Sequence, residues 1–414
     1  MSNFKFKPDP TPQTECGELC LGPRATTCAA PPSAPPGAAV AVALSGGLDS
    51  LMAACILKEQ GHRVLGVHAR FIAKNSEAEA ADVAALQKAC DYLGLELHVL
   101  DLRGAFQNQV IEPFMAAYVA GKTPNPCALC NPRLKFGLLM DAAERLGAPF
   151  LATGHYARLG IFTPQGSLGR TEAFTTIFPA HDPSKDQSYF LALVPPQRLA
   201  RAIFPLHGSL KKDLAQKAQD LGLPVPQPKE SQEICFVPND DYRAFLQAHC
   251  ANLPGPGPML LQNGAKLGTH KGLWQYTEGQ RRGLGIAWSE PLYVLGKNLS
   301  DNSLLLGPKQ FLDCREVTVG NLNILIPPRF WPEQITARVR YRQRPCPAKV
   351  VWPAEADNSN LGGSNFDSNN LEAGNLEAGQ LRLIFQQPEE PPAKGQLAAL
   401  YHPNGCILAG GIIE

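Results

Sequence analysis

The sequence predicts an α/β protein with three folded parts: a doubly wound parallel sheet, a small central Gly-rich module and a C-terminal β-barrel. Apolar strand patterns alternate with amphipathic helical patterns from residue 40 onward, residues 254–308 are Gly-rich, and short strand-like runs recur regularly after residue 317. A chain of 414 residues is long enough for two or three domains. We therefore expect a first domain over residues 38–245, a linker domain over 246–310 and a barrel over 311–414.

The first domain is expected to carry its functional groups along one edge of the sheet. Ser45, Asp101 and the pair Gly154-His155 each follow a predicted strand. The carboxyl ends of parallel strands share one edge, and ligands bind there in open α/β sheets. The strands are expected at residues 40–44, 64–69, 97–100 and 149–153, and the helices at residues 51–59, 77–93, 106–120, 134–146, 211–221 and 240–248.

Shorter patterns describe the rest of the chain. The Gly-rich module has strand-like runs at residues 292–295 and 304–306. Residues 1–37 are rich in Pro, Thr and Ala without a period, which predicts a disordered extension. Residues 354–379 are rich in Asn, Ser and Gly, which predicts a flexible insertion in the barrel. The barrel strands are expected at residues 317–325, 335–341, 348–352, 380–385, 396–401 and 406–413.

Composition narrows the class of protein. No apolar run approaches the roughly 20 residues that span a bilayer, and no signal pattern opens the chain, so we expect a cytoplasmic protein without a membrane partner. With a net charge of +1, a nucleic-acid site has to concentrate its basic residues locally. In a reducing cytosol the 12 cysteines do not indicate a disulfide framework. No metal centre is predicted, since Cys16, Cys20 and Cys28 lack a nearby histidine or fourth cysteine.

The stretch Ser45-Gly46-Gly47-Leu48-Asp49-Ser50 joins the first predicted strand to the first predicted helix. Glycines let backbone N–H groups approach a ligand closely, and a helix N-terminus favours an anion. The lysine of the common phosphate loop G-x-x-x-x-G-K-[ST] is absent. The stretch therefore predicts a phosphate cradle of another kind, with an ordinary Gly-containing bend between strand and helix as the alternative.

Two loops contain candidate reactive thiols. Cys127 and Cys130 lie in a Pro-rich loop, and we expect Cys130 near a helix N-terminus, where the helix dipole lowers a thiol pKa. Cys235 lies among polar residues far along the chain. From the residues alone, Cys-x-x-Cys also fits half of a zinc site or a redox pair. Cys235 also fits simple packing between Ile234 and Phe236.

A series of motifs from residue 40 to the C-terminus resembles one family, the tRNA-specific 2-thiouridylases. The loop at residues 45–50 alone is similar to the pyrophosphatase loop of ATP enzymes that adenylate a substrate, which leaves the acceptor open. Chance agreement of all the motifs in order is very improbable. They occupy residues 45–50, 125–131, 152–158, 185–191, 231–238, 271–285, 338–343 and 408–413.

The resemblance implies an adenine-nucleotide alpha-hydrolase-like sheet and a transferase, a tRNA-uridine 2-sulfurtransferase. ATP would adenylate the C2 oxygen of the wobble uridine and release pyrophosphate, and a cysteine persulfide, loaded by a sulfur donor protein, would then deliver sulfur, giving 2-thiouridine and AMP. The family pattern assigns the persulfide to Cys235 and the nucleophile to Cys130, with a disulfide between them as by-product. Asp49 is expected to help hold Mg²⁺. The ATP-binding residues are expected to be Ala43, Leu44, Ser45, Gly46, Gly47, Leu48, Asp49, Ser50, Ala69 and Gly154.

The resemblance also implies a tRNA-binding surface. Arginines recur at period 2 from Arg338 to Arg344, which on a strand would form a phosphate-reading face, or else an ordinary solvated face. Cys127 stands where the family often has aspartate. It could bond to Cys130 or complete a three-thiolate iron–sulfur site with Cys130 and Cys235, but we favour the two-cysteine route. The RNA-binding residues are expected to be Asn125, Pro126, Cys127, His155, Lys185, Asp186, Gln187, Arg340, Tyr341 and Gln396.

Two other functions compete with tRNA thiolation. The first is adenylation of a small molecule, as in the amidotransferase synthetases, which leaves the C-terminal barrel without a role. The second is a non-catalytic RNA- or metal-binding protein that uses its Cys-x-x-Cys sequence.

Overall fold

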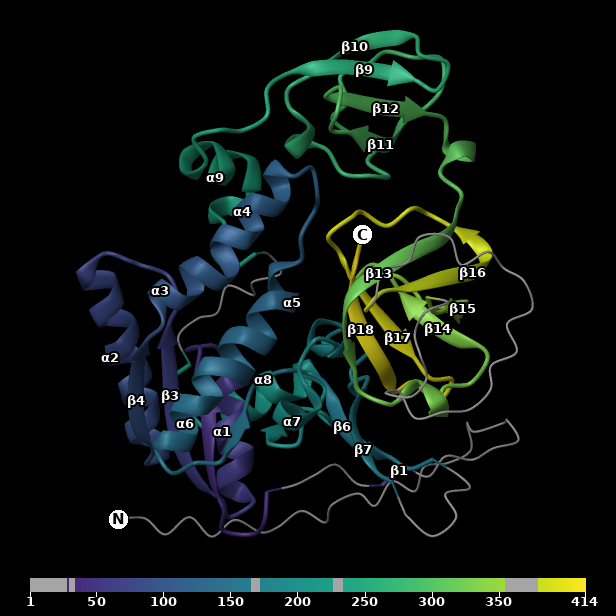
Figure 1. The fold of residues 1–414 in the computed structure, drawn as a ribbon. Helices are drawn as coiled ribbons and strands as arrows, with labels where there is room; N and C mark the ends of the chain where they lie inside the picture. Colours follow the sequence, from purple (N-terminus) through teal and green to yellow (C-terminus); the bar gives the residue numbers. More distant parts are fainter. Residues whose placement is uncertain (1–27, 30–33, 165–171, 226–233, 354–378) are drawn as a thin grey trace.

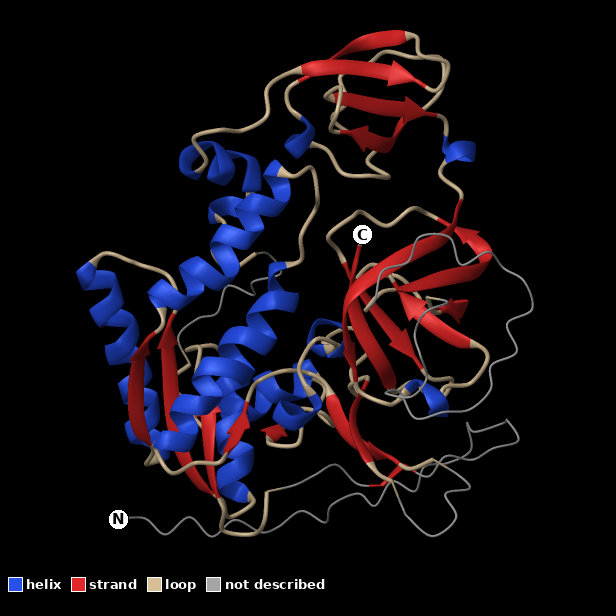
Figure 2. Cartoon of the chain, in the orientation of Figure 1, coloured by secondary structure: helices blue, strands red, loops and turns tan. Residues whose placement is uncertain are grey.

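The computed structural model describes residues 28–29, 34–164, 172–225, 234–353 and 379–414. Figure 1 shows three parts: an α/β domain at the lower left, a β-barrel at the right, and a small β-module above them. Figure 2 shows that helices are concentrated in the first part, whereas the other two consist mainly of strands. The predicted fold class is confirmed. Among the described residues no helix has the length and apolar composition that crossing a bilayer requires.

The α/β domain is built on a parallel five-stranded sheet in the order β4-β3-β2-β5-β8. Its central strand β2 is apolar throughout and its three middle residues are buried, as expected for a parallel sheet covered on both faces. The four predicted strands are confirmed, and the two-residue β8 was not predicted. The strands are β2 (Ala39–Ala43), β3 (Arg63–Arg70), β4 (Glu96–Asp101), β5 (Phe150–Ala152) and β8 (Ala202–Ile203).

Two of the predicted helices are longer and less regular than expected. The helix predicted at residues 106–120 combines α3 (Arg103–Phe106), the π-helical η1 (Gln107–Ile111) and α4 (Glu112–Val119). The helix predicted to begin at residue 134 begins at Pro126, because the π-helical segment η2 carries it past a second proline, Pro132. Its parts are α5 (Pro126–Cys130), η2 (Asn131–Leu139) and α6 (Met140–Arg145). The other helices are α1 (Leu48–Glu59), α2 (Ser76–Leu93), α7 (Pro196–Leu199), α8 (Lys211–Asp220) and α9 (Tyr242–His249).

A small antiparallel sheet, β1-β6-β7, was not predicted. It consists of β1 (Cys28–Ala29), β6 (Arg158–Phe162) and β7 (Phe174–Phe178). Since β1 pairs with β6, the expectation of an extension without regular structure is wrong at residues 28–29. Residues 1–27 and 30–33 of that extension, and residues 354–378 of the predicted insertion, lie outside the described residues.

The C-terminal part is a closed barrel of six strands in the order β13-β16-β15-β14-β17-β18, as predicted. The central module is a four-stranded sheet, β10-β9-β12-β11, of which β11 and β12 were predicted. The module strands are β9 (Gly257–Leu261), β10 (Lys266–His270), β11 (Tyr293–Asn298) and β12 (Ser303–Gly307). The barrel strands are β13 (Cys314–Ile324), β14 (Ile335–Arg338), β15 (Cys346–Val351), β16 (Leu381–Glu389), β17 (Leu397–Tyr401) and β18 (Ile407–Ile413).

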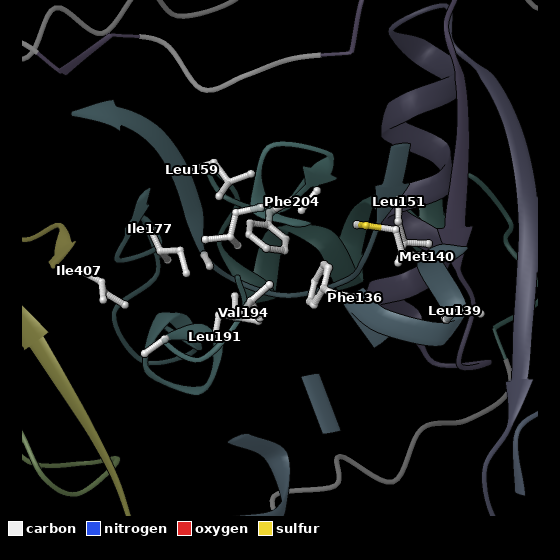
Figure 3. Packing of buried hydrophobic residues seen from close by; sticks show 14 of the residues in the cluster. Phe136, Leu139, Met140, Leu151, Leu159, Ile177, Leu191, Val194, Phe204 and Ile407 are labelled. Atoms are coloured by element: carbon white, nitrogen blue, oxygen red, sulfur yellow. The ribbon is translucent and has the colours of Figure 1, made fainter. Parts of the chain in front are cut away.

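Barrel and α/β domain share one apolar core. Phe136 and Met140 from the α/β domain lie in the same buried cluster as Tyr401 and Ile407 from the barrel, and Figure 3 shows part of this packing. Burying apolar surface at this boundary contributes roughly 25 cal/mol per Å². The two parts therefore form one body, and groups on the barrel have fixed positions relative to the sheet edge.

Candidate active site

The predicted phosphate cradle has the expected strand–loop–helix geometry between β2 and α1. Gly46 has a φ of +83°, in the region that favours glycine, and Gly47 is the N-cap of α1. The Ser50 hydroxyl donates to the Gly47 carbonyl at 2.9 Å and accepts from the Ser45 N–H at 3.2 Å. Ser45 and Ser50 therefore close the loop at the start of a 12-residue helix, which is the arrangement that binds anions.

Gly154 lies against this loop from the end of β5. A Cβ added at Gly154 would be 2.9 Å from the Asp49 carbonyl carbon and 2.9 Å from the Ser50 nitrogen. Only glycine permits this approach without moving the backbone of the loop. The structure thus brings together two stretches that the sequence assigned separately to one nucleotide site.

Asp49 is held by two residues that sequence reasoning missed. The Tyr156 hydroxyl donates to Asp49 Oδ1 at 2.8 Å, and the Lys211 ammonium donates to the same oxygen at 2.5 Å. Lys211 opens α8 and thus supplies, from far along the chain, the positive charge that the loop itself lacks. Tyr156 lies within the quoted motif at residues 152–158, but no local signal in the sequence pointed to Lys211.

Ala69 and Asp101 also lie at the carboxyl edge of the sheet, but Asp101 is not part of the cradle. Ala69 is half-buried near the end of β3, which neighbours β2 in the sheet. Asp101 at the end of β4 pairs with Arg103, with 2.9 Å between Arg103 Nε and Asp101 Oδ1. Hydrogen bonds from Arg103 lower the pKa of Asp101 to about 2. This carboxylate is engaged with its own neighbour rather than with the cradle.

The two thiols of the Pro-rich loop lie on α5. Asn125 is the N-cap of this helix, with its side chain accepting from the Ala128 N–H at 3.3 Å, and Pro126 occupies the first turn. Cys130 is 8% exposed, and burial raises its pKa to about 12. The predicted lowering of this pKa is therefore wrong for this conformation, because desolvation outweighs the nearby positive charge of Lys135.

The structure brings the Cys235 segment to Cys130. Cys130 packs in one apolar cluster with Phe114 and Phe236, the residue after Cys235. The Phe114 and Phe236 rings lie 5.1 Å apart in an edge-to-face arrangement. Ionisation of Cys235 would further raise the pKa of Cys130, which places the two thiols within electrostatic reach of each other. Cys235 is exposed and Cys130 is buried, and both are free.

Cys127 is also exposed and free, and its charge would raise the pKa of Cys235. Desolvation by the surrounding protein raises its own pKa. Within the part of the chain that the structure describes, no three His, Cys, Asp or Glu side chains come together as metal ligands. Cys127, Cys130 and Cys235 therefore do not form a ready metal centre here.

Lys135, which sequence reasoning also missed, connects the thiols to the cradle. Its charge lowers the pKa of Cys127, Cys130 and Cys235, although burial has the larger, opposite effect at each. Its ammonium is 3.4 Å from Nε2 of His155, the neighbour of Gly154. Lys135 therefore acts electrostatically on the thiols and contacts the neighbour of Gly154 in the predicted cradle.

His155 is buried rather than displayed on the surface. Its Nδ1 is 2.7 Å from the Thr153 hydroxyl oxygen, and its ring lies near the Phe136 and Phe204 rings. Burial and the neighbouring Lys135 hold the pKa of His155 well below its usual value. The ring is therefore neutral at pH 7, so that one of its nitrogens can donate a hydrogen bond and the other can accept one.

The three consecutive candidates at residues 185–187 lie between the α/β domain and the barrel. Asp186 is buried and accepts from the Ser188 hydroxyl at 2.9 Å, and its Oδ2 lies 3.4 Å from an Arg338 nitrogen. Gln187 accepts from the Tyr156 N–H at 3.1 Å, and Lys185 is half-buried. Asp186 thus stabilises the contact with the barrel.

The predicted stripe of arginines does not form. Strand β14 ends at Arg338, so the later arginines lie in a turn instead of alternating along a strand. Arg340 pairs with Glu390 at 2.8 Å, and the Tyr341 hydroxyl donates to the Asp186 carbonyl at 3.2 Å. Arg340 and Tyr341 both follow the end of β14. Along a strand they would face opposite sides, whereas in the turn after the strand they can lie on the same surface.

Gln396, the last RNA-binding candidate, contacts the Pro-rich loop. Its amide donates to the Thr123 carbonyl at 2.8 Å. One candidate residue of the barrel therefore contacts the loop that leads into α5.

Comparison with known proteins agrees with this geometry. Residues 38–239 match a family model described as "tRNA methyl transferase HUP domain", and residues 243–308 match "tRNA methyl transferase PRC-barrel domain". The chain is 49% identical to the tRNA-specific 2-thiouridylase MnmA of Oleidesulfovibrio alaskensis, over 90% of this chain and 98% of that protein. It is 46% identical to the MnmA of Nitratidesulfovibrio vulgaris strain Miyazaki F and 44% identical to that of Lawsonia intracellularis, each over 90% of this chain and 98% of the relative. Identity of this degree over nearly the whole of each relative means that the chain belongs to the tRNA-specific 2-thiouridylase family.

Proposed function

We propose that this protein catalyses ATP-dependent 2-thiolation of the wobble uridine of tRNA. The observation that carries the proposal is the meeting of the Cys130 and Cys235 segments beside a phosphate cradle, with Lys135 between them. Neither thiol alone distinguishes this reaction from others. A buried and an exposed thiol at one nucleotide site fit sulfur transfer, which needs one cysteine to carry sulfur and another to release it.

The first step is adenylation, and the cradle supports it. The uridine C2 oxygen attacks the α-phosphorus of ATP, and pyrophosphate leaves with the electron pair of the broken P–O bond. Ser45, Ser50 and the N-terminus of α1 would hold the phosphates, and Lys211 would neutralise their charge. The ten residues expected to bind ATP stay a proposal.

Asp49 fits the role of a Mg²⁺ ligand. It is a carboxylate at the cradle, and Tyr156 and Lys211 both donate to its Oδ1. Protein-bound Mg²⁺ is commonly held by one or two carboxylates plus substrate phosphates. The ion would supply charge neutralisation on the phosphates. Tyr156 would hold the carboxylate in place.

The second step is sulfur transfer. The terminal sulfur of a Cys235 persulfide attacks C2, and AMP leaves with the C2 oxygen. The Cys130 thiolate then attacks the Cys235 sulfur, so that the outer sulfur stays on the base and a Cys130–Cys235 disulfide forms. A dithiol reductant reopens this disulfide by exchange. We propose a persulfide-carrying protein as the sulfur donor, and the cytoplasm as the location.

The RNA-binding residues also stay a proposal. Asn125, Pro126 and Cys127 open the helix that carries Cys130, which suits contact with the target base. His155 lies beside Gly154 at the cradle. A base has to leave its stack to reach such a site.

The test is mass spectrometry of nucleosides after incubation with tRNA, ATP, Mg²⁺ and a persulfide donor. The wild type is expected to form 2-thiouridine, whereas Cys130→Ser and Cys235→Ser form none but still bind tRNA and release pyrophosphate. Cys250→Ser is the control, because Cys250 is a half-buried thiol that the reaction does not use. Full activity in Cys130→Ser or Cys235→Ser would contradict the proposal. Methyl transfer, named in the family models, would require no pyrophosphate release.

A further inference from the structure

The loop that leads into α5 belongs to the α/β domain and is contacted by both other parts of the protein. It runs from Gly121 to Asn125, and we refer to these residues as the joint. From the barrel, the Lys394 carbonyl accepts from the Thr123 N–H at 2.8 Å, and the Gln396 amide donates to the Thr123 carbonyl at 2.8 Å. From the central module, the Thr277 hydroxyl oxygen lies 3.1 Å from the Thr123 hydroxyl oxygen. Thr123 is thus bonded to the barrel and to the module at once.

A buried lysine fixes the start of the joint. Lys297 of β11 donates to the Gly121 carbonyl at 2.6 Å, and its side chain is only 3% exposed. That carbonyl follows the C-terminus of α4, where a positive charge is favourable. Glu278 lies 4.0 Å from the same ammonium and offsets its burial. The central module therefore recognises the end of α4 with a buried charge.

The barrel approaches the joint too closely to move independently of it. Gly395 has a φ of +90°, and a Cβ there would lie 3.1 Å from the Lys122 Cβ. By contrast, the main apolar core of the central module contains only its own residues. Trp274 of the module packs in the apolar cluster of Cys130 and Phe114, and the polar contacts at the joint act together with that packing to position the module.

The joint is stiff between Thr123 and α5. Pro124 and Pro126 fix their own φ angles and restrict the residues before them. Asn125 between them caps α5 through its side chain. A displacement at Thr123 therefore passes to the start of the helix that carries Cys130, instead of being absorbed by the loop.

We propose that the joint holds α5, and with it Cys130, in a position set by the barrel and the central module, and that Thr123, Thr277 and Gln396 are its positioning residues. The inference rests on the proposed function for its meaning. Gln396 is also an expected RNA contact, and an RNA group that takes its amide withdraws it from Thr123. Binding of tRNA is thereby linked to release of the helix that buries the reactive thiol.

The test measures alkylation of Cys130 by iodoacetamide, followed by peptide mass spectrometry, in the enzyme without tRNA. Thr123→Val and Thr277→Val remove one hydroxyl each while keeping the side-chain shape. Since a net hydrogen bond is worth about 1 kcal/mol, each is expected to raise the alkylation rate about fivefold. The double variant is expected to be no faster than either single variant, because both remove the same bond.

Gln396→Leu distinguishes the role of Gln396 in the joint from its expected role in RNA binding. It is expected to raise the rate of Cys130 alkylation in the absence of tRNA, which loss of an RNA contact alone cannot do. Thr123→Ser, which keeps the hydroxyl, is expected to behave like the wild type. Arg329→Gln is the matched control, because Arg329 pairs with Glu172 at 2.9 Å and joins barrel to α/β domain away from the joint.

Steady-state kinetics give a second measurement. In Thr123→Val and Thr277→Val we expect kcat for thiolation to fall while KM for ATP stays the same, and Arg329→Gln to leave both unchanged. The proposed role of the joint would be overturned by alkylation rates equal to the wild type in the Thr123, Thr277 and Gln396 variants. Multiplicative effects in the double variant would also overturn it. Failure of the wild type to thiolate tRNA would instead overturn the proposed function. The alkylation measurements would still show whether the joint positions Cys130.

Discussion

Gly154→Ala tests whether the cradle depends on the close approach of two separate stretches of chain. The added methyl group would lie 2.9 Å from two backbone atoms, the Asp49 carbonyl carbon and the Ser50 nitrogen, and 3.1 Å from Asp49 Cβ. Two of these atoms belong to the backbone at the start of α1, so no flexible side chain can yield. The loop has to withdraw by about 0.5 Å to restore ordinary van der Waals contact.

Overpacking of this kind costs about 1–3 kcal/mol, and each 1.4 kcal/mol is tenfold in an equilibrium constant. Because the loop moves away from the phosphates, we expect KM for ATP to rise by about tenfold or more. We also expect the thermal midpoint to fall by about 2–4 °C for each kcal/mol lost. The assay is pyrophosphate release at varied ATP concentration with tRNA in excess, together with thermal unfolding.

Gly104→Ala is the matched control for this substitution. Gly104 lies in α3, and a Cβ there meets nothing within 4 Å. We expect the control to keep the wild-type KM and to gain slightly in stability, since alanine favours the helix. A wild-type KM for ATP in Gly154→Ala would refute the reasoning, because the loop would then tolerate the displacement.

Three further predictions follow from the same geometry. Lys211→Met removes the cation 2.5 Å from Asp49 and is expected to raise KM for ATP about tenfold, with the tRNA affinity measured by filter binding unchanged. Asp186→Ala removes the buried partner of the partly exposed Arg338 and is expected to lower the free energy of unfolding by about 2 kcal/mol in urea titrations. A loss below about 0.5 kcal/mol would show that barrel and domain do not depend on this pair. Burial raises the pKa of Cys130 to about 12, so its thiolate fraction grows tenfold per pH unit below that value. The alkylation rate of Cys130 is therefore expected to keep rising from pH 7 to pH 10. A plateau above pH 9 would contradict the burial of this thiol.

Much of the fold was predictable because its signals are local. The barrel strands are short runs, either alternating like β15 or apolar throughout like β17, and all six were found at nearly their observed positions. The parallel strands are short apolar runs that follow glycines, and the four longest were found in the same way. By contrast, β8 has two residues and β1 has two, so neither carries a period that a sequence pattern can reveal.

The helix that carries Cys130 shows why local patterns fail at the site. Two prolines, Pro126 and Pro132, indicate a loop, and the sequence therefore placed the helix start beyond Cys130. In the structure Pro126 occupies the first turn, where its missing N–H costs nothing, and the chain passes Pro132 as a π-helix. This earlier start and the surrounding aromatic rings bury the thiol, which reverses the expected direction of its pKa shift.

The remaining site residues depend on contacts distant in sequence. Lys211 reaches Asp49 across 162 residues and Gln396 reaches Thr123 across 273 residues. Lys135 and His155 are only 20 residues apart, but they lie on different elements. No spacing in the sequence encodes such contacts, because they follow from how the elements pack. The prediction of an arginine stripe was wrong for a different reason. The arginines do recur at period 2, but the strand ends at Arg338, the first of them.

The central claim is that Cys130 and Cys235 react with each other at the nucleotide site. The most direct measurement is a single turnover with persulfide-loaded enzyme, tRNA and ATP, stopped by an alkylating agent and analysed by non-reducing peptide mass spectrometry. The account predicts a linked pair of peptides containing Cys130 and Cys235, in an amount equal to the 2-thiouridine formed. Formation of 2-thiouridine with both cysteines recovered as separate alkylated peptides would contradict it.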